Sequence, residues 1–494
     1  MPAFPLQPIP TPLIFERSRE GRPGTSVPKP IAPKRAADVL PRGALGAKAP
    51  DLPEVPEFGV VRHYIELSLK NHHVDRALYP LGSCTMKYNP KVNEDMARLP
   101  GFLGLHPMAP DAQAQGALAL MHELGEWLKE ICGMDAITLE PSAGAQGEMT
   151  GIFLVAAYHK SRGDTARKVV IVPDSAHGTN PATAALAGFT VRGIKSNAKG
   201  LTDLAALKAA LGPDVAALML TNPSTIGRFE TEVVEVAKLV HDAGALLYMD
   251  GANMNALIGI TRPGDFGVDV MHFNLHKTFA TPHGGGGPGS GPVAVKRILE
   301  PFLPVPVVVK EDGRYRRVWD RKQSIGKLHG YFGNFGVMVR AYTYIAKLGR
   351  EGIRETAQGA VLNANYLAAR IEHKYPMPYG RGMHECVATG TPFKQFGIKT
   401  LDIAKRLLEF GFHAPTVYFP LIVPEALMIE PTETETKEDL DRFADAMLQI
   451  ADEAEKTPEL LTSAPRTTPV SRFDEAAAAR SPNVRWVRAS SRKD

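Results

Sequence analysis

The stretch ALLYMDGANMNA, residues 245–256, decides the fold of this chain. It opens with five apolar residues, which suits a short strand buried on both faces, and then changes abruptly to Asp250 and Gly251. Three more runs have the same character: KVVIV at 168–172, VAALML at 215–220 and VMHFNL at 270–275. We interpret all four as strands of one buried sheet.

Helical patterns alternate with these strands. They cover about residues 202–212 and 231–244, and an upstream pattern covers 111–132, where Gly133 follows as expected just past a helix. Strands that alternate with helices of this length predict a doubly wound, mostly parallel sheet with helices on both faces. The fold class is therefore α/β, and its ligands should bind beyond the carboxyl ends of the strands.

Asp250 and Lys277 each follow such a strand. Both have an ordinary explanation, because Asp-Gly is a common turn pair and a lysine at a strand end is usually a surface charge. Together they supply a carboxylate and an amine at one edge of the sheet. Pyridoxal phosphate chemistry requires this pair, since the amine binds the cofactor aldehyde and the carboxylate keeps the pyridine nitrogen protonated.

Two other strand ends carry side chains that suit the same cofactor. After the run at 168–172, His177 can lie flat against the pyridine ring, and Thr179 and Asn180 can donate hydrogen bonds. After the next run, Asn222 is within reach of the ring hydroxyl. The alternatives are a turn histidine in solvent and a routine Asn-Pro turn.

The segment EPSAGAQGE, residues 140–148, predicts a strand-to-helix junction. The backbone N–H groups of Gly144, Ala145 and Gln146, with the Ser142 hydroxyl, can receive a phosphate at a helix N-terminus. The segment matches neither G-x-G-x-x-G nor a Walker P-loop. The glycine run at 284–287 suits phosphate binding, a mobile loop or close packing equally well, and we assign it no phosphate.

Composition limits the remaining possibilities. The chain has 494 residues, with 57 Lys+Arg against 53 Asp+Glu and a net charge of +4, and the two signs are interspersed, which does not indicate nucleic-acid binding. No run reaches the ~18 apolar residues of a membrane-spanning helix, and the start of the chain lacks a signal-peptide pattern. Three scattered cysteines predict neither a disulfide framework nor a metal centre. We expect a cytoplasmic protein without membrane contact.

Four parts are expected along the chain. They are a proline-rich arm without regular helix at 1–58, a large cofactor-binding domain at 59–313, a smaller C-terminal α/β domain at 314–462, and a basic tail, loosely held, at 463–494. In the smaller domain the patterns predict helices near 334–373 and 399–410 and short strands in CVATG, TVYFP and ALMIEP. Glu433 and Thr434 precede the last long helix, where N-capping explains them without a catalytic role.

The motifs together resemble a known family. YPLGSCTMKYNP at 79–90, EPSAGAQGE, PDSAHGTNP, LTNPST, DGANMNA and HFNLHKTFATPHGGGGPG occur in the order found in fold-type I, aspartate aminotransferase-like pyridoxal phosphate enzymes. They resemble more narrowly the P-protein of the glycine cleavage system, over roughly residues 60–450. In length the chain is similar to subunit 2 of the two-gene bacterial form.

The resemblance implies roles for particular residues. Lys277 is then the Schiff-base lysine, and Ala252 and Thr278 join the cofactor-binding residues. His276 either moves a proton or braces the loop. In the segment 79–90, Lys87 can neutralise a carboxylate or phosphate, and Cys84 is either redox-sensitive or a small buried thiol.

The resemblance also implies the reaction and its partners. Glycine loses carbon dioxide on pyridoxal phosphate, and the aminomethyl group passes to the lipoyl arm of H-protein, which acts as the oxidant. A subunit 1 of the same fold, without the cofactor lysine, assembles with this chain as an α2β2 heterotetramer. The chain would thus be an oxidoreductase, glycine dehydrogenase of the aminomethyl-transferring type.

Two rival interpretations remain open at this point. One is another fold-type I decarboxylase or lyase, such as a cysteine desulfurase that uses Cys386. The other is a non-catalytic scaffold subunit with the same fold, against which Lys277 argues, because a silent copy does not need that lysine.

Overall fold

A computed structural model describes residues 11–22, 24, 28, 31–48, 50–284 and 286–486. Its contacts divide the chain into two units, one of Met1–His73 with Ser463–Asp494 and the other of Val74–Thr462. The first prolines of the expected arm, up to Pro10, lie outside the described residues, as does Gly285 in the glycine run.

The first unit joins the two ends of the chain. It contains α1 (Ala36–Val39), α2 (Glu57–Ser68) and α14 (Glu475–Arg480). α1 is a single helical turn inside the arm, where the proline content predicts none. Phe15 of the arm stacks on Trp486 of the tail with 4.8 Å between ring centroids, so the two segments contact each other.

The second unit is built on a seven-stranded sheet. Its strands are β1 (Ala136–Thr138), β2 (Val169–Pro173), β3 (Thr190–Ile194), β4 (Val215–Thr221), β5 (Leu246–Asp250), β6 (Val270–His272) and β7 (Val293–Val295), in the order β1-β7-β6-β5-β4-β2-β3. β7 runs antiparallel to both of its neighbours, β1 and β6, and the other pairs in this sheet are parallel. The four expected strands are confirmed, although β6 ends three residues earlier than VMHFNL predicts.

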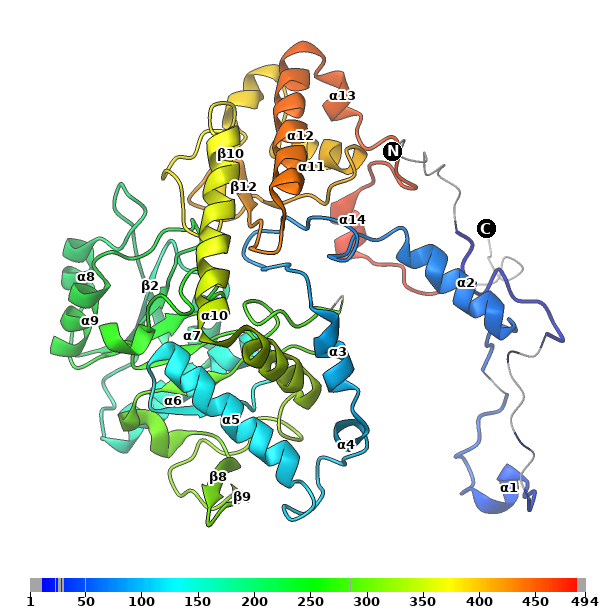
Figure 1. Ribbon diagram of the computed structural model, residues 1–494, viewed down its shortest axis with the longest axis horizontal. Helices are drawn as coiled ribbons and strands as arrows, with labels where there is room; N and C mark the ends of the chain where they lie inside the picture. The colour runs from blue at the N-terminus through cyan, green and yellow to red at the C-terminus, as the bar shows by residue number, and fades with distance from the viewer. Residues whose placement is uncertain are drawn as a thin grey trace. The chain divides into compact units, whose positions relative to one another are not determined.

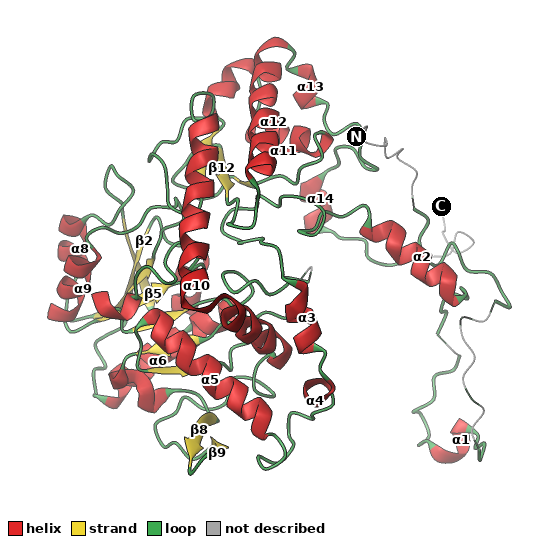
Figure 2. Ribbon diagram, in the orientation of Figure 1, coloured by secondary structure: helices red, strands yellow, loops and turns green. Residues whose placement is uncertain are grey.

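Two separate apolar clusters cover the two faces of this sheet, because successive side chains of a strand point to opposite sides. Leu218 and Leu247 belong to one cluster with α5 (Gln115–Cys132) and α9 (Val233–Asp242). Met219 and Tyr248 belong to the other with α6 (Gly144–Ser161) and α7 (Thr179–Leu186). Figure 2 shows α8 (Leu204–Ala210) beside α9.

The helix predicted from residue 111 begins four residues later, at Gln115. Asp111 instead forms an ion pair with Arg317, at 2.5 Å, on the hairpin of β8 (Val307–Glu311) and β9 (Arg314–Val318). Gly133 ends α5 at φ 70°, the left-handed conformation that glycine adopts without steric cost.

A second, three-stranded sheet follows in the chain. It consists of β10 (Cys386–Thr389), β12 (Ala426–Ile429) and β11 (Thr416–Val417), in that order, and packs with α11 (Thr400–Glu409), α12 (Lys437–Lys456) and α13 (Glu459–Thr462). The long helix α10 (Phe335–Ile371) kinks at Gly349 and precedes this sheet (Figure 1). Shorter segments are α3 (Lys91–Ala97), α4 (Pro100–Leu103), η1 (Pro263–Phe266), η2 (Arg297–Phe302) and η3 (Thr391–Phe396).

Two details bear on the expected division of the chain. The boundary at 313/314 falls in the turn of the β8–β9 hairpin, whose strands pair across it, and the four-part division stays a prediction. The N-cap of α12 is Thr436, whose hydroxyl accepts the backbone N–H of Asp439, so neither Glu433 nor Thr434 caps that helix. Within the described ranges no helix is both long and apolar enough to cross a bilayer.

Leu218 tests the packing of the central strand. It is fully buried in β4, and Leu218→Ala should cost about 2–5 kcal/mol because it leaves a cavity in a close-packed core. We expect a clearly lower midpoint of thermal unfolding. Leu362→Ala on α10, where the side chain is 69% exposed, is the matched control and should change stability by less than about 0.5 kcal/mol. Equal shifts in the two variants would contradict this account of the core.

Candidate active site

Three strand ends lie level at one edge of the large sheet. Thr221 pairs in register with Asp250, and Asp250 pairs in register with His272. All three residues line a cavity of about 120 Å³ at the carboxyl ends of the parallel strands. The cavity therefore lies where an α/β sheet is expected to bind its ligand.

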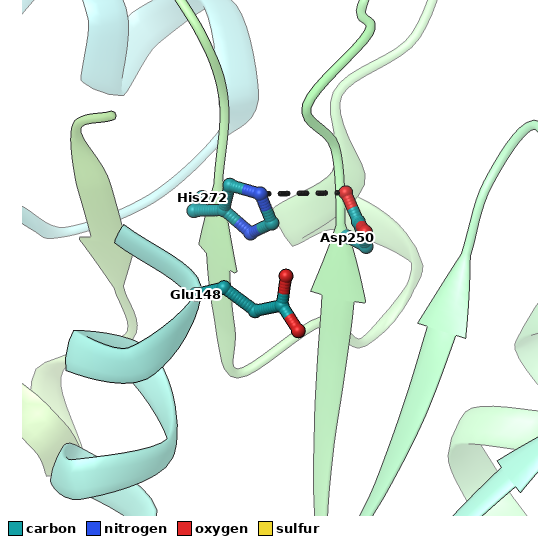
Figure 3. A group of neighbouring side chains, drawn as sticks. All are labelled: Glu148, Asp250 and His272. Carbon is teal, nitrogen blue, oxygen red and sulfur yellow. Dashed lines mark ion pairs between the residues drawn. The ribbon is translucent and has the colours of Figure 1, made fainter. Parts of the chain in front are cut away.

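Asp250 is the buried charge of this cavity. Its Oδ2 accepts a hydrogen bond from Asn180 Nδ2 at 3.0 Å, and Oδ1 accepts the backbone N–H of Ala252 at 3.0 Å. His272 Nε2 lies 3.4 Å from Oδ1 (Figure 3). Burial acts to raise the pKa of Asp250, but His272, Asn180 and His177 act against it, and the net effect lowers the pKa. The side chain is thus held as a carboxylate.

His272 and Glu148 lie beside this carboxylate (Figure 3). Tyr248 Oη lies 2.6 Å from His272 Nδ1, and burial keeps the pKa of Tyr248 well above its usual value, so the phenol remains a donor to Nδ1. Nε2 is then left to carry the ring proton toward Asp250. Glu148 comes from α6, and ligand atoms of Glu148, Asp250 and His272 lie within 4.8 Å of one another. Hydrogen bonds already occupy Asp250 and Glu148, which favours an electrostatic role over metal ligation.

His177 and Lys277 line the same cavity as Asp250. His177 Nδ1 lies 2.8 Å from the Thr179 hydroxyl, which in turn donates to Glu148 at 2.7 Å. Burial lowers the pKa of His177, Asp250 opposes this effect, and Lys277 adds to it. The ring is therefore neutral near pH 7, which suits a flat contact with an aromatic ligand.

The N-terminus of α6 provides another part of the cavity wall. Gly144 and Ala145 line the cavity directly. A Cβ atom at Gly144 would come within 2.5 Å of Asn274, so only glycine permits this approach. Ser142 and Gln146 do not line the cavity, because the Ser142 hydroxyl and backbone N–H both bind Gln146 Oε1.

Four further predicted site residues are not brought to the cavity wall. Asn222 accepts the backbone N–H of Glu230 at 3.0 Å and is 1% exposed, while its neighbour Thr221 faces the cavity instead. The Thr278 hydroxyl accepts the backbone N–H of Met254. His276 Nδ1 accepts the backbone N–H of Ser290 at 3.2 Å. Of the two roles left open for His276, moving a proton or bracing the loop, this contact matches bracing. Asn180 affects the cavity indirectly, because its side chain donates a hydrogen bond to Asp250.

A further wall comes from residues that the sequence analysis missed. His384 and Glu385, just before β10, line the cavity together with Ser83. Glu385 Oε2 accepts the backbone N–H of Ser83 at 2.9 Å. The signal available in the sequence was a His-Glu pair immediately before the apolar run of CVATG, but nothing local links it to a segment 300 residues earlier.

The segment around Ser83 is held in an unusual conformation. Ser83 and Thr85 have φ values of 65° and 51°, which are costly for residues with a Cβ atom. Glu430, after β12, accepts both the backbone N–H of Thr85 at 2.9 Å and its hydroxyl at 2.7 Å. Cys84 between them is a free thiol whose pKa burial raises, as expected for a small, largely buried cysteine.

Lys87 forms a buried ion pair with Glu433 at 2.7 Å. The side chains are 1% and 13% exposed. Lys87 also donates to Asn255 Oδ1 at 2.7 Å and to the carbonyl of Thr278 at 2.9 Å. The carboxylate that Lys87 was expected to neutralise is therefore Glu433, and the capping role considered for Glu433 is wrong.

These side chains fit pyridoxal phosphate. Asp250 offers a buried negative charge for the pyridine nitrogen, and Lys277 offers an amine in the same cavity. The backbone of Gly144 and Ala145 at a helix N-terminus suits an anionic group.

Comparison with known proteins agrees with the assignment of a pyridoxal phosphate site and identifies the family. The chain is 57% identical over 482 residues to the probable glycine dehydrogenase (decarboxylating) subunit 2 of Chloroherpeton thalassium, covering 96% of this chain and 98% of the relative. It is 59% identical over 479 residues to the protein of that name from Prosthecochloris aestuarii, with coverage of 96% and 98%. The chain belongs to the glycine dehydrogenase (decarboxylating) subunit 2 family.

Matches to parts of the chain and to solved structures agree with this family. Residues 356–467 match the glycine dehydrogenase C-terminal domain, and residues 146–287 match aminotransferase class-V. A crystal structure of glycine decarboxylase (P-protein) in inhibitor-bound form aligns with TM-score 0.70 at 22% identity, covering 84% of this chain and 94% of that one. A NifS-like protein aligns with TM-score 0.60 at 16% identity, covering 76% and 99%. The fold is that of the fold-type I enzymes, and pyridoxal phosphate is the cofactor of the subunit 2 family.

The Lys87–Glu433 pair yields a stability prediction. Lys87→Met should destabilise the protein by about 3–5 kcal/mol, because it leaves the Glu433 carboxylate buried without its cation. Adding Glu433→Gln should recover part of that loss, which thermal unfolding of both variants would measure. A double variant less stable than Lys87→Met would show that the pair is not the source of the loss.

His276 yields a pH dependence. Burial, with smaller contributions from His283 and Lys277, lowers the pKa of His276 from 6.5 to about 4. Between these values the unfolded chain binds more protons than the folded protein, so stability should fall as the pH falls from 6.5 toward 4. His276→Gln should reduce that fall when unfolding midpoints at pH 7 and pH 5 are compared. The control, exposed His73→Gln, should keep the wild-type pH dependence.

Proposed function

We propose that this chain binds pyridoxal phosphate and removes the carboxyl group of glycine as carbon dioxide. The observation that carries this proposal is the joint placement of Asp250 and Lys277 on one cavity, in a chain 57% identical to a probable glycine dehydrogenase (decarboxylating) subunit 2. The proposal includes the predicted site residues that face this cavity. It leaves out Asn222 and Thr278 as direct ligands, because their side chains bind other groups.

When bound, pyridoxal phosphate supplies an aldehyde for an amine and a ring that accepts electrons. Lys277 would hold the cofactor through its side-chain amine. Asp250 would keep a proton on the pyridine nitrogen through its buried negative charge, an interaction that strengthens as water is excluded. His177 would contact the ring, and the N–H groups of Gly144 and Ala145 would receive the phosphate.

The expected partners belong to the same proposal. The relatives are called subunit 2, which supports a second subunit for this chain, and an α2β2 assembly is our expectation. The aminomethyl group left after decarboxylation would pass to the lipoyl disulfide of H-protein, which is reduced as the carbon–sulfur bond forms. We expect the complex in the cytoplasm. The free cysteines agree with this expectation, because thiols stay reduced in that compartment.

The desulfurase alternative is weakened by the position of Cys386. This thiol lies in β10, is 1% exposed and does not line the cavity. Burial raises its pKa to about 12, so it remains protonated and a poor nucleophile.

Exchange of labelled bicarbonate into the carboxyl group of glycine tests the proposal. We expect exchange only when this chain is combined with subunit 1 and oxidised lipoyl H-protein, and not with this chain alone. Lys277→Ala should abolish both the exchange and the visible absorbance of bound cofactor. Bound cofactor without exchange in any mixture would assign the chain to another amino acid, and no bound cofactor at all would support the scaffold alternative.

A further inference from the structure

No arginine occurs among the described residues that line the cavity, although glycine carries a carboxylate. Lys277 is the single Lys or Arg side chain among those described lining residues, and in the proposed function the cofactor would occupy it. Because a buried carboxylate needs hydrogen-bond donors, some other group must receive it. Two side chains just before β10, His384 and Glu385, meet this requirement.

His384 is a buried histidine without a partner. It is 2% exposed, and neither ring nitrogen has a hydrogen-bond partner within the part of the chain that the structure describes. Buried polar groups are nearly always hydrogen-bonded, so an orphan that faces a cavity indicates a missing ligand. Burial lowers the pKa of His384, and Lys277 acts in the same direction while Glu430 opposes it. The ring is therefore neutral and offers one N–H donor.

Glu385 is the second donor on this wall. It is 3% exposed, and Ser83 N–H already occupies its Oε2. Burial and the nearby Glu430 carboxylate raise the pKa of Glu385 well above its usual value. Glu430 accepts three hydrogen bonds of its own, two from Thr85 and one from Asn253. Glu385 therefore holds a proton, and Oε1 is left to carry it.

We propose that His384 and Glu385 hold the carboxylate of glycine through two neutral hydrogen-bond donors. This inference rests on the proposed function and adds the substrate contact to it. The two residues are adjacent in sequence, and ligand atoms of both lie within 4.8 Å of Glu430, so the backbone and Glu430 fix their positions.

Neutral donors suit the loss of carbon dioxide better than a guanidinium group does. When the carbon–carbon bond breaks, its electron pair passes to the cofactor ring and the former carboxylate leaves as a neutral molecule. A cation paired with the carboxylate would stabilise the state before the bond breaks and lose that interaction in the transition state. His384 and Glu385 orient the carboxylate without that cost to the rate.

Methylamine, which is glycine without its carboxyl group, allows a direct test. The complex with subunit 1, loaded with cofactor, is titrated with each amine, and binding is followed by the change in cofactor absorbance. His384→Ala and Glu385→Leu should each weaken glycine binding about 10- to 100-fold, the effect of a lost hydrogen bond to a charged group. Methylamine binding should stay within about 3-fold of wild type. Should His384→Ala not fold, His384→Leu fills the site without offering a donor.

Two further variants separate contact from general disturbance. Glu385→Gln keeps a neutral donor and should bind glycine within about 5-fold of wild type. Glu435→Gln is the matched control, because burial raises the pKa of Glu435 to about 7 and this residue does not line the cavity. Its glycine affinity should equal that of wild type.

Each other outcome has a definite meaning. Equal weakening for both amines would make His384 and Glu385 structural supports and overturn the inference while the proposed function stands. Unchanged glycine binding in His384→Ala and Glu385→Leu would also overturn it. Wild-type complex that binds cofactor but neither binds glycine nor exchanges bicarbonate would overturn the proposed function itself, and the inference with it.

Discussion

The buried charge of Asp250 is the constraint on which the site depends. A carboxylate moved from water into a protein interior is stable only if hydrogen bonds and nearby positive or polar groups replace its hydration. Here the replacements come from three segments: Asn180 on α7, the backbone of Ala252 after β5, and His272 at the end of β6. Keeping Asp250 ionised therefore requires α7, β5 and β6 to hold these three groups in their present positions around the carboxylate.

The same requirement explains why the cavity wall is rich in polar side chains that bind one another. Glu148 accepts hydrogen bonds from Thr179 and Asn180, and Asn180 also donates to Asp250. Two carboxylates thus share one amide donor, which fixes their spacing. Tyr248 orients His272 through a hydrogen bond to Nδ1, which leaves Nε2 facing Asp250. A chain of hydrogen-bonding groups thus leads from Tyr248 in the sheet interior through His272 to Asp250 at the cavity.

Sequence reasoning found the sheet, the edge at which ligands bind, and most residues that come directly after a strand. It placed Asp250, His177 and Lys277 at or after strand ends, and all three line one cavity, because the apolar runs show roughly where neighbouring parallel strands end. It failed for Asn222, since the direction of a side chain at a turn depends on tertiary contacts, here with Glu230. The β3 and β7 strands were missed because neither lies in a continuous apolar run of strand length: β3 contains Arg192 and Gly193, and β7 has only three residues.

Two further residues, Glu385 and Glu430, escaped sequence reasoning for a different reason. Their role arises from contacts between segments about 300 residues apart, and no local pattern encodes such a contact. A buried glutamate reads the same in sequence whether it is charged or protonated.

Environment alone separates the two cases in this protein. Glu433 has Lys87 at 2.7 Å, and that cation compensates a buried negative charge. Glu385 has another carboxylate nearby instead, and none of the ion pairs formed by the described residues includes it. A bound proton therefore removes the repulsion between the two carboxyl groups.

Residues 83–87 contact both of these glutamates, since Ser83 binds Glu385 and Lys87 binds Glu433. Glu385, which lines the cavity, and the neighbouring Glu430 therefore hold Ser83 and Thr85 at their positive φ values. A substitution in this short segment would alter the loop conformation and the protonation of Glu385 together, because the backbone N–H of Ser83 is one of the few groups that favour the charged form of that side chain.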